Sequence, residues 1–247
     1  MRAGIEIGSA KMRRGVDLIG RDNAKASIVR IRYSGDLRYI EHMSLKAAIE
    51  AVYVAFSDAI KPLLVEGCPC CMTADEYEAL TAKPLRELSE DELEEYTGDA
   101  LLTMGTEEDY AYFLPRILEL TTEKGTYGLT AIEITAEKIR MAGFEHWSEE
   151  RQSAIKSLWL SYIGEMASSG DPHFDIDSWL AAATLIPIPV APFLEALETA
   201  PDVIREMRNS NFMTMYQGRL KNAFLQEQSK GQAEIAKWLV ASHAGLE

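Results

Sequence analysis

The sequence predicts an all-α protein, an irregular multi-helix array of antiparallel hairpins packed either as a bundle or as a short HEAT-like solenoid. Three observations from Met43 onward support this prediction. Apolar residues recur at three- and four-residue spacing. Serine or threonine followed three residues later by glutamate precedes several of these stripes. Glycine and proline separate the stripes. No repeat of fixed period is present, so the sequence does not choose between bundle and solenoid.

The first predicted helices follow from capping residues. Ser44 is a suitable N-cap for a helix running to about Leu64, with an apolar stripe of Leu45, Ala48, Ile49, Val52, Phe56 and Ile60. Thr73 with Glu76 has the spacing of a capping box and predicts a short helix through Leu80. Ser89 with Glu92 repeats that spacing before a helix that ends by Gly105.

Further helices are predicted after Thr106, where three acids suit a first turn, and after Thr130 and Ser148. Pro115 must kink the first of these or begin a second helix at Arg116. Residues 168–173 break the pattern and mark a possible sub-boundary. Beyond this break the predicted helices are 176–185, 190–199, 201–210, 214–229 and 231–243.

Residues 1–42 differ in charge from the rest of the chain. They hold nine Lys/Arg and five Asp/Glu, a net of +4, whereas residues 43–247 carry the remaining net of -18. Only Ser27–Tyr33 has a strand-like pattern. One interpretation is a basic arm that binds nucleic acid or the protein's own acidic body. The interpretation we favour is a disordered or non-native extension, with Met43 as the natural start of an acidic helical domain, 43–247.

The bulk composition excludes several classes of protein. A net charge of -14 argues against general nucleic-acid binding and against docking on an anionic membrane. No apolar run approaches the ~20 residues of a membrane span, and no secretory signal opens the chain. The cysteines number three and lie within four positions, which makes a poor disulfide framework. We therefore expect a cytoplasmic protein.

Cys68, Cys70 and Cys71 are the one chemically unusual feature. They precede a predicted helix, whose N-terminus lowers the pKa of a nearby thiol. Three interpretations stay open: packing in the core, a zinc site, or redox chemistry. A zinc ion would need a fourth ligand, which must come from an acid or from one of the histidines, His42, His146, His173 and His243.

Other chemical signals are weaker. The sequence has no His-Glu-X-X-His, no phosphate-binding glycine loop and no Gly-X-Ser-X-Gly. His173, Asp175 and Asp177 form a minor candidate for an acid/base site, although an aspartate there also suits helix capping.

Two stretches resemble an uncharacterised family of bacterial cytosolic, mostly helical proteins. One joins Cys68-Pro69-Cys70-Cys71 to Pro84-Leu85-Arg86-Glu87-Leu88; the other runs from Asp99 through Phe113-Leu114-Pro115-Arg116-Ile117-Leu118-Glu119-Leu120. The resemblance covers about residues 44–165. It departs at Met104, where an aromatic residue is expected. It implies that the cysteine loop and the segment around Pro115 are family features, and it carries no activity to any residue.

The sequence favours a non-enzymatic module that binds another protein, because the chain is acidic and helical and shows no catalytic constellation. The alternative is a zinc- or thiol-dependent protein that uses Cys68, Cys70 and Cys71.

Overall fold

A computed structural model describes residues 27–33, 36–124, 129–169, 175–225 and 229–242. The chain divides into two compact units, Met1–Met43 and Ser44–Glu247. In the first unit, strands β1 (Ser27–Tyr33) and β2 (Asp36–His42) pair antiparallel, with Val29 opposite Ile40. The strand-like pattern noted at Ser27–Tyr33 coincides with β1, and the sequence showed no such pattern for β2. Residues 1–26 lie outside the described residues, so the interpretation of 1–42 as an extension stays a prediction.

The second unit is all-α, as predicted. Its elements are α1 (Leu45–Ala55), α2 (Ala74–Ala82), η1 (Leu85–Glu87), α3 (Glu90–Asp99), α4 (Glu107–Lys124), α5 (Ile132–Met141), η3 (Phe144–His146), α6 (Glu149–Ser169), α7 (Asp175–Leu185), α8 (Ala191–Leu197), α9 (Pro201–Met215) and α10 (Lys230–Ala241). Across its described residues, strand-like pairing is limited to isolated bridges at Met104. Among the described helices, none combines the length and apolar composition needed to cross a bilayer.

Three predicted caps begin helices as expected. The Ser44 hydroxyl accepts a hydrogen bond from the Ala47 amide at the start of α1. Thr73 and Ser89 each complete a capping box, with Glu76 and Glu92 returning a carboxylate to the cap amide at 2.7 and 2.9 Å. These local signals act within one turn of the chain, so the sequence reports them directly.

Two predicted boundaries are wrong, and one predicted cap is not formed. Helix α1 ends at Ala55 and not near Leu64, because the predicted extension crosses Pro62, which disfavours helix in the residue before it. Helix α5 begins after Ala131 without a side-chain cap. Of the two alternatives at Pro115, the structure shows the single helix, because α4 continues through Pro115 and does not restart at Arg116. The helix predicted at 214–229 does not form in the described residues; α9 continues to Met215, and Gly218 follows at φ +72°.

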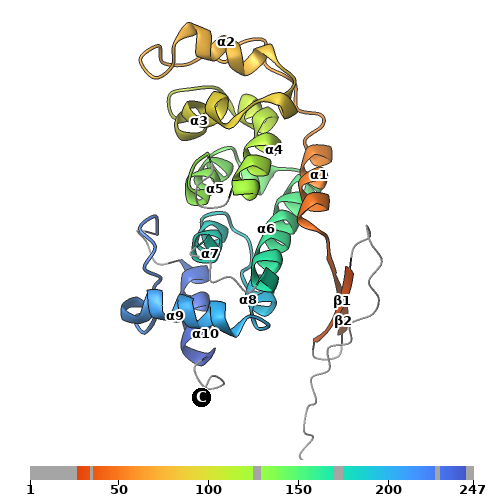
Figure 1. Cartoon of the computed structure of the whole chain (residues 1–247), viewed down its shortest axis with the longest axis vertical. Helices are drawn as coiled ribbons and strands as arrows, with labels where there is room; N and C mark the ends of the chain where they lie inside the picture. The colour runs from red at the N-terminus through yellow and green to blue at the C-terminus, as the bar shows by residue number, and fades with distance from the viewer. Residues whose placement is uncertain (1–26, 34–35, 125–128, 170–174, 226–228, 243–247) are drawn as a thin grey trace, which may run out of the picture. The chain divides into compact units, whose positions relative to one another are not determined.

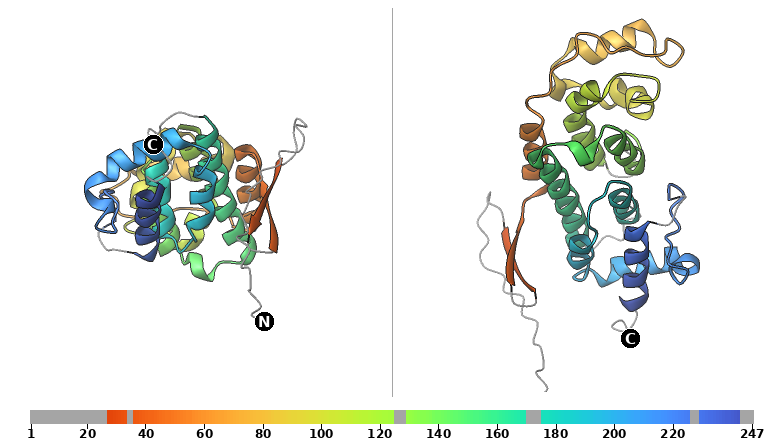
Figure 2. Two further views of the ribbon diagram at one scale, coloured as in Figure 1. Left: turned by 90° about the horizontal axis from the view of Figure 1, so that it is seen from below. Right: turned by 180° about the vertical axis from the view of Figure 1, so that it is seen from behind.

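Packing joins helices that are distant in sequence. Helix α1 packs on α6, α5 on α7 and α6 on α8, while α9 lies against α10 (Figures 1 and 2). The core between α6 and α7 holds fully buried tryptophans, with the Trp159 and Trp179 ring centroids 4.8 Å apart and Tyr162 stacked on Trp179 at 4.0 Å. The contacts of α5 with α7 and of α6 with α8 are those expected between stacked helix pairs, whereas the contact of α1 with α6 joins segments far apart in sequence, so the helices form an irregular array.

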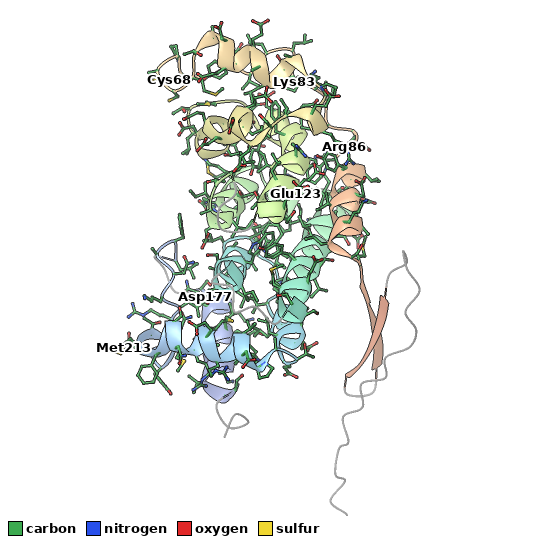
Figure 3. The ribbon with its side chains drawn as sticks, in the orientation of Figure 1. Cys68, Lys83, Arg86, Glu123, Asp177 and Met213 are labelled. Atoms are coloured by element: carbon green, nitrogen blue, oxygen red, sulfur yellow. A yellow bond between two sulfur atoms is a disulfide. The ribbon has the colours of Figure 1, made fainter. Side chains whose placement is uncertain are left out.

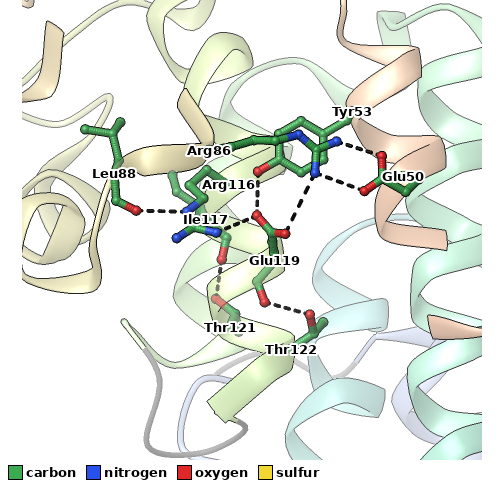
Figure 4. A network of polar contacts seen from close by, with 9 residues as sticks. All are labelled: Glu50, Tyr53, Arg86, Leu88, Arg116, Ile117, Glu119, Thr121 and Thr122. Carbon is green, nitrogen blue, oxygen red and sulfur yellow. Dashed lines mark hydrogen bonds and ion pairs between the residues drawn. The ribbon is translucent and has the colours of Figure 1, made fainter. Parts of the chain in front are cut away.

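A polar network ties α1 to η1 and α4 (Figure 4). The Arg86 guanidinium makes a bidentate contact with Glu50 at 2.9 and 2.7 Å, and it lies 3.6 Å above the Tyr53 ring. Glu119 accepts hydrogen bonds from the Tyr53 hydroxyl and from Arg116, both at 2.6 Å. Burial and the hydrogen bond to Glu119 raise the pKa of Tyr53, so the hydroxyl remains a donor. The network thereby anchors the chain on both sides of the segment between α1 and η1, which contains the cysteines.

A buried lysine lies on α5. Lys138 is 3% exposed, and its Nζ has no hydrogen-bond partner among the described residues. Burial lowers the pKa of Lys138, while the negative charges of Asp99 and Glu137 oppose the shift. The folded protein then binds fewer protons than the unfolded chain between the lowered pKa and the ordinary value of 10.5. Stability must rise with pH across that interval.

Lys138→Met tests this charge. We expect the free energy of unfolding at pH 7 to increase by about 1–3 kcal/mol, because a buried unpaired ammonium is replaced by an apolar chain of similar length. Urea unfolding at several pH values between 7 and 10 measures the effect, and the rise of stability with pH should flatten. Lys237→Met, at an exposed position of α10, is the matched control. A Lys138→Met protein less stable than the parent would contradict the expectation.

Candidate functional site

The three cysteines lie together in the loop that precedes α2 (Figure 3, Cys68). Their sulfur atoms are all within 4.8 Å of one another. Cys68 and Cys70 are joined by a disulfide across Pro69, and Cys71 is a free thiol. The sequence predicted a set of cysteines poorly suited to a disulfide framework, and the structure joins two of them. We call residues 67–71 the cysteine loop.

This disulfide contributes little to the stability of the fold. It connects residues only two positions apart. The chain entropy that a crosslink removes from the unfolded state grows with loop length, reaching ~3 kcal/mol for about 15 residues, so this bridge contributes less. Cys70 is exposed at the surface, and exposed disulfides are typically the labile or catalytic ones.

Backbone pairing holds the loop on the turn after α3. The Cys68 amide donates to the Thr103 carbonyl at 2.9 Å, and the Gly105 amide donates to the Glu66 carbonyl at 2.8 Å. The Thr103 hydroxyl also donates to the Cys71 sulfur at 3.5 Å. The turn itself needs two left-handed residues, Leu101 at φ +62° and Gly105 at φ +64°. Positive φ is uncommon for leucine, so the surrounding contacts must hold this conformation.

Tyr77 supports the loop from α2. Its hydroxyl donates to the Cys68 carbonyl at 3.2 Å, and the side chain is buried. A Cβ atom at Gly67 would lie 2.1 Å from the Tyr77 hydroxyl oxygen, so only glycine fits there without a shift. Burial raises the pKa of Tyr77, as do the nearby Cys71 and Asp99, and the hydroxyl therefore stays protonated as a donor.

The core-packing interpretation does not hold for Cys70 and stays a prediction for Cys68 and Cys71. Cys68 and Cys71 are half-buried and Cys70 is exposed, whereas the neighbouring Met72 is 3% exposed. Met72 anchors this part of the chain to the core, and the sulfur atoms that precede it remain near the surface. Sequence periodicity did not identify Met72 as the anchor, because it lies before the first helical turn of α2.

A zinc ion would find three sulfur ligands here, but among the described side chains no histidine or carboxylate completes the group. His146 is exposed on η3 and is not part of it. His42, His173 and His243 lie outside the described side chains. Thiolate sulfurs suit zinc and other soft cations, so the reduced loop offers a three-sulfur site with a fourth position for an external ligand.

The minor acid/base candidate is only partly described. His173 lies outside the described residues, as does the side chain of Asp175. Asp177 on α7 is held by the fully buried Asn211, whose side-chain amide donates to both carboxylate oxygens at 3.2 and 2.9 Å. Burial raises the pKa of Asp177, against the effect of these hydrogen bonds. The hydrogen bonds from Asn211 give this carboxylate a structural partner, and the proposed triad stays a prediction.

No protein-family model, curated protein or solved structure is significantly similar to this chain. The resemblance to an uncharacterised bacterial family therefore stays a prediction, and function must be argued from the cysteine loop itself.

Gly67→Ala tests the support of the loop. We expect a loss of about 1–3 kcal/mol in the free energy of unfolding, because the new Cβ must displace the Tyr77 ring or the loop backbone. Urea denaturation measures the loss, and adding Tyr77→Phe should recover part of it.

The matched control is Gly98→Ala, since a Cβ at this exposed position of α3 meets nothing within 4 Å. It should stabilise the protein by up to about 1 kcal/mol, because alanine favours helix over glycine. Equal effects of the two substitutions would contradict the role assigned to Gly67.

Proposed function

We propose that the protein is thiol-dependent and that the cysteine loop is its functional centre, cycling between a Cys68–Cys70 disulfide and two thiols. The observation that carries the proposal is the convergence of three sulfur atoms within 4.8 Å on a surface loop, two of them already bonded. Thiol–disulfide exchange is the chemistry that such a cluster supports.

The exchange reaction balances without a further reactant. A thiolate of a partner attacks the exposed Cys70 sulfur, the Cys68–Cys70 bond breaks, and Cys68 leaves as a thiolate that takes up a proton. A second thiolate of the partner then attacks the partner sulfur that is bonded to Cys70. This step forms a disulfide within the partner and releases Cys70 as a thiolate, which also takes up a proton. The partner is oxidised from dithiol to disulfide, the loop is reduced, and two electrons and two protons have moved. The reverse reaction with a partner disulfide restores the loop.

Cys71 gives the loop a third sulfur within reach of both members of the bridge. Its thiolate can attack the Cys70 or Cys68 sulfur of a mixed disulfide, which forms a disulfide between Cys71 and that cysteine, breaks the bond to the partner and releases the partner as a thiolate. The Thr103 hydroxyl orients the Cys71 sulfur, so this thiol is held beside the bridge. Backbone bonds on either side limit how far the loop can rearrange during exchange.

A redox titration of the full chain tests the proposal. In dithiol buffers from about -180 to -300 mV, the number of free thiols should change reversibly by two per chain. Cys71→Ser should keep this change of two, whereas Cys68→Ser combined with Cys70→Ser, which leaves a single thiol, should abolish it. A parent protein whose thiol count stays constant over the whole range would refute the cycle.

Zinc content separates the metal version of the proposal from the purely redox one. If the reduced protein binds zinc through three thiolates, each of Cys68→Ser, Cys70→Ser and Cys71→Ser should release it, and oxidation to the disulfide should do the same. Less than about a tenth of an equivalent of zinc, with stability unchanged by chelation, removes the metal version.

A protein-interaction module is the second candidate, and exposed apolar residues on α9 favour it. Phe212, Met213 and Tyr216 are 57%, 77% and 58% exposed and lie within five consecutive positions (Figure 3, Met213). Aromatic and methionine side chains are enriched in interfaces. Such a surface needs no chemistry at the cysteines.

Co-purification from native cytosol tests this candidate. A stoichiometric protein partner should appear with the parent chain, and the binding should weaken at least tenfold with Met213→Ser. Val54→Ser, at an isolated position that is 71% exposed on α1, should leave binding unchanged. Absence of any stoichiometric partner would count against the module.

A further inference from the structure

Two segments whose charged side chains are all acidic meet at the cysteine loop, and the loop belongs to the first of them. Residues 62–82 and 99–109 contain no lysine or arginine, and each holds four acids: Glu66, Asp75, Glu76 and Glu78 in the first, and Asp99, Glu107, Glu108 and Asp109 in the second. The backbone bonds between Glu66 and Gly105 and between Cys68 and Thr103 bring the two segments together at the loop. The local charge is thus more one-sided than the net charge of the chain indicates.

The nearest lysines along the first segment are already engaged elsewhere. Lys83 lies at the opposite end of α2 from Cys68 and pairs with Glu92 at 2.6 Å (Figure 3). Lys61 donates to the Lys83 carbonyl at 2.9 Å, so it too is held at that end of α2. Neither cation offsets the acids beside the disulfide.

Exposed leucines accompany this acidic surface. Leu102 is 63% exposed and belongs to the turn whose next residue, Thr103, pairs with Cys68. Leu63 and Leu64 are 98% and 60% exposed in the segment that leads into the loop. Three large apolar side chains therefore lie on the two segments that carry the reactive disulfide, where a bound polypeptide would cover them.

We propose that the redox partner of the loop is a cysteine in a basic polypeptide segment with apolar residues beside the cysteine, and not a small anionic thiol. The proposal rests on the thiol–disulfide function proposed above. Exposed acids of the two segments, among them Glu66 and Asp75, provide the charge complement for lysine and arginine, and the exposed leucines provide contact area for apolar residues of the partner.

Charge affects the rate of this reaction because the attacking group is an anion. Glutathione as a thiolate carries a net negative charge, so acids around the disulfide repel it as it approaches the Cys70 sulfur. A thiolate within a lysine-rich segment belongs to a peptide of net positive charge, and the acidic surface attracts that peptide. Steering by a one-sided surface changes association rates by about 10- to 1000-fold, and salt removes much of the effect.

Three probes test the proposal on the full, oxidised chain. Two are peptides of equal length with one cysteine between leucines, one rich in lysine and the other rich in glutamate; the third is glutathione. Mass spectrometry measures the rate of mixed-disulfide formation. At low salt the lysine peptide should react at least 10-fold faster than either anionic thiol, and the ratio should fall towards one near 1 M salt.

Substitutions locate the effect. Glu66→Gln combined with Asp75→Asn should reduce the ratio several-fold. Glu198→Gln combined with Glu234→Gln removes the same net charge at exposed positions distant in sequence and should leave the ratio unchanged. Leu102→Ser should slow the leucine-flanked lysine peptide while leaving a serine-flanked version unaffected.

The outcomes separate this inference from the function on which it rests. Equal rates for all three probes, or a ratio that the loop-proximal and distant substitutions lower equally, would overturn the basic-partner proposal while the redox cycle stands. A disulfide that no probe opens and that dithiothreitol fails to reduce reversibly would overturn the redox cycle as well.

Discussion

The position of the cysteine loop depends on a short backbone pairing between two segments that are far apart in sequence. Two hydrogen bonds, from Cys68 to Thr103 and from Gly105 to Glu66, hold the loop on the turn that ends α3. The pairing requires glycine at 67, where Tyr77 leaves no room for a side chain, and positive φ at Leu101 and Gly105. Because these constraints act on the backbone, they fix the loop on this turn, with Cys70 exposed and Cys68 and Cys71 partly buried.

Asp99 connects the loop to the interior of the helical unit. Its carbonyl accepts hydrogen bonds from the amides of Leu102 and Thr103 and so shapes the turn that receives the loop. Its carboxylate acts electrostatically on Tyr77, beside the cysteines, and on the buried Lys138 of α5.

Local features of the fold and of the site followed from the sequence. The capping boxes at Thr73 and Ser89 predicted two helix starts, because a cap and its glutamate interact within a single turn. Adjacent cysteines predicted a sulfur cluster, since neighbours in sequence cannot separate far in space. The predicted helix at 214–229 failed because apolar spacing alone does not reveal where tertiary contacts end one helix and require a turn, here at Gly218.

The sequence by itself determined that the domain after Met43 is helical and that three thiols share one loop, because both depend on interactions within a few residues. Only the tertiary structure decided that α1 packs on α6, that Arg86, Tyr53 and Glu119 form one network, and that the turn after α3 receives the cysteine loop. Each of these contacts joins segments that are far apart along the chain, and no pattern in the sequence shows which distant segments will meet. Contact between them depends on how the buried faces of many helices pack at once.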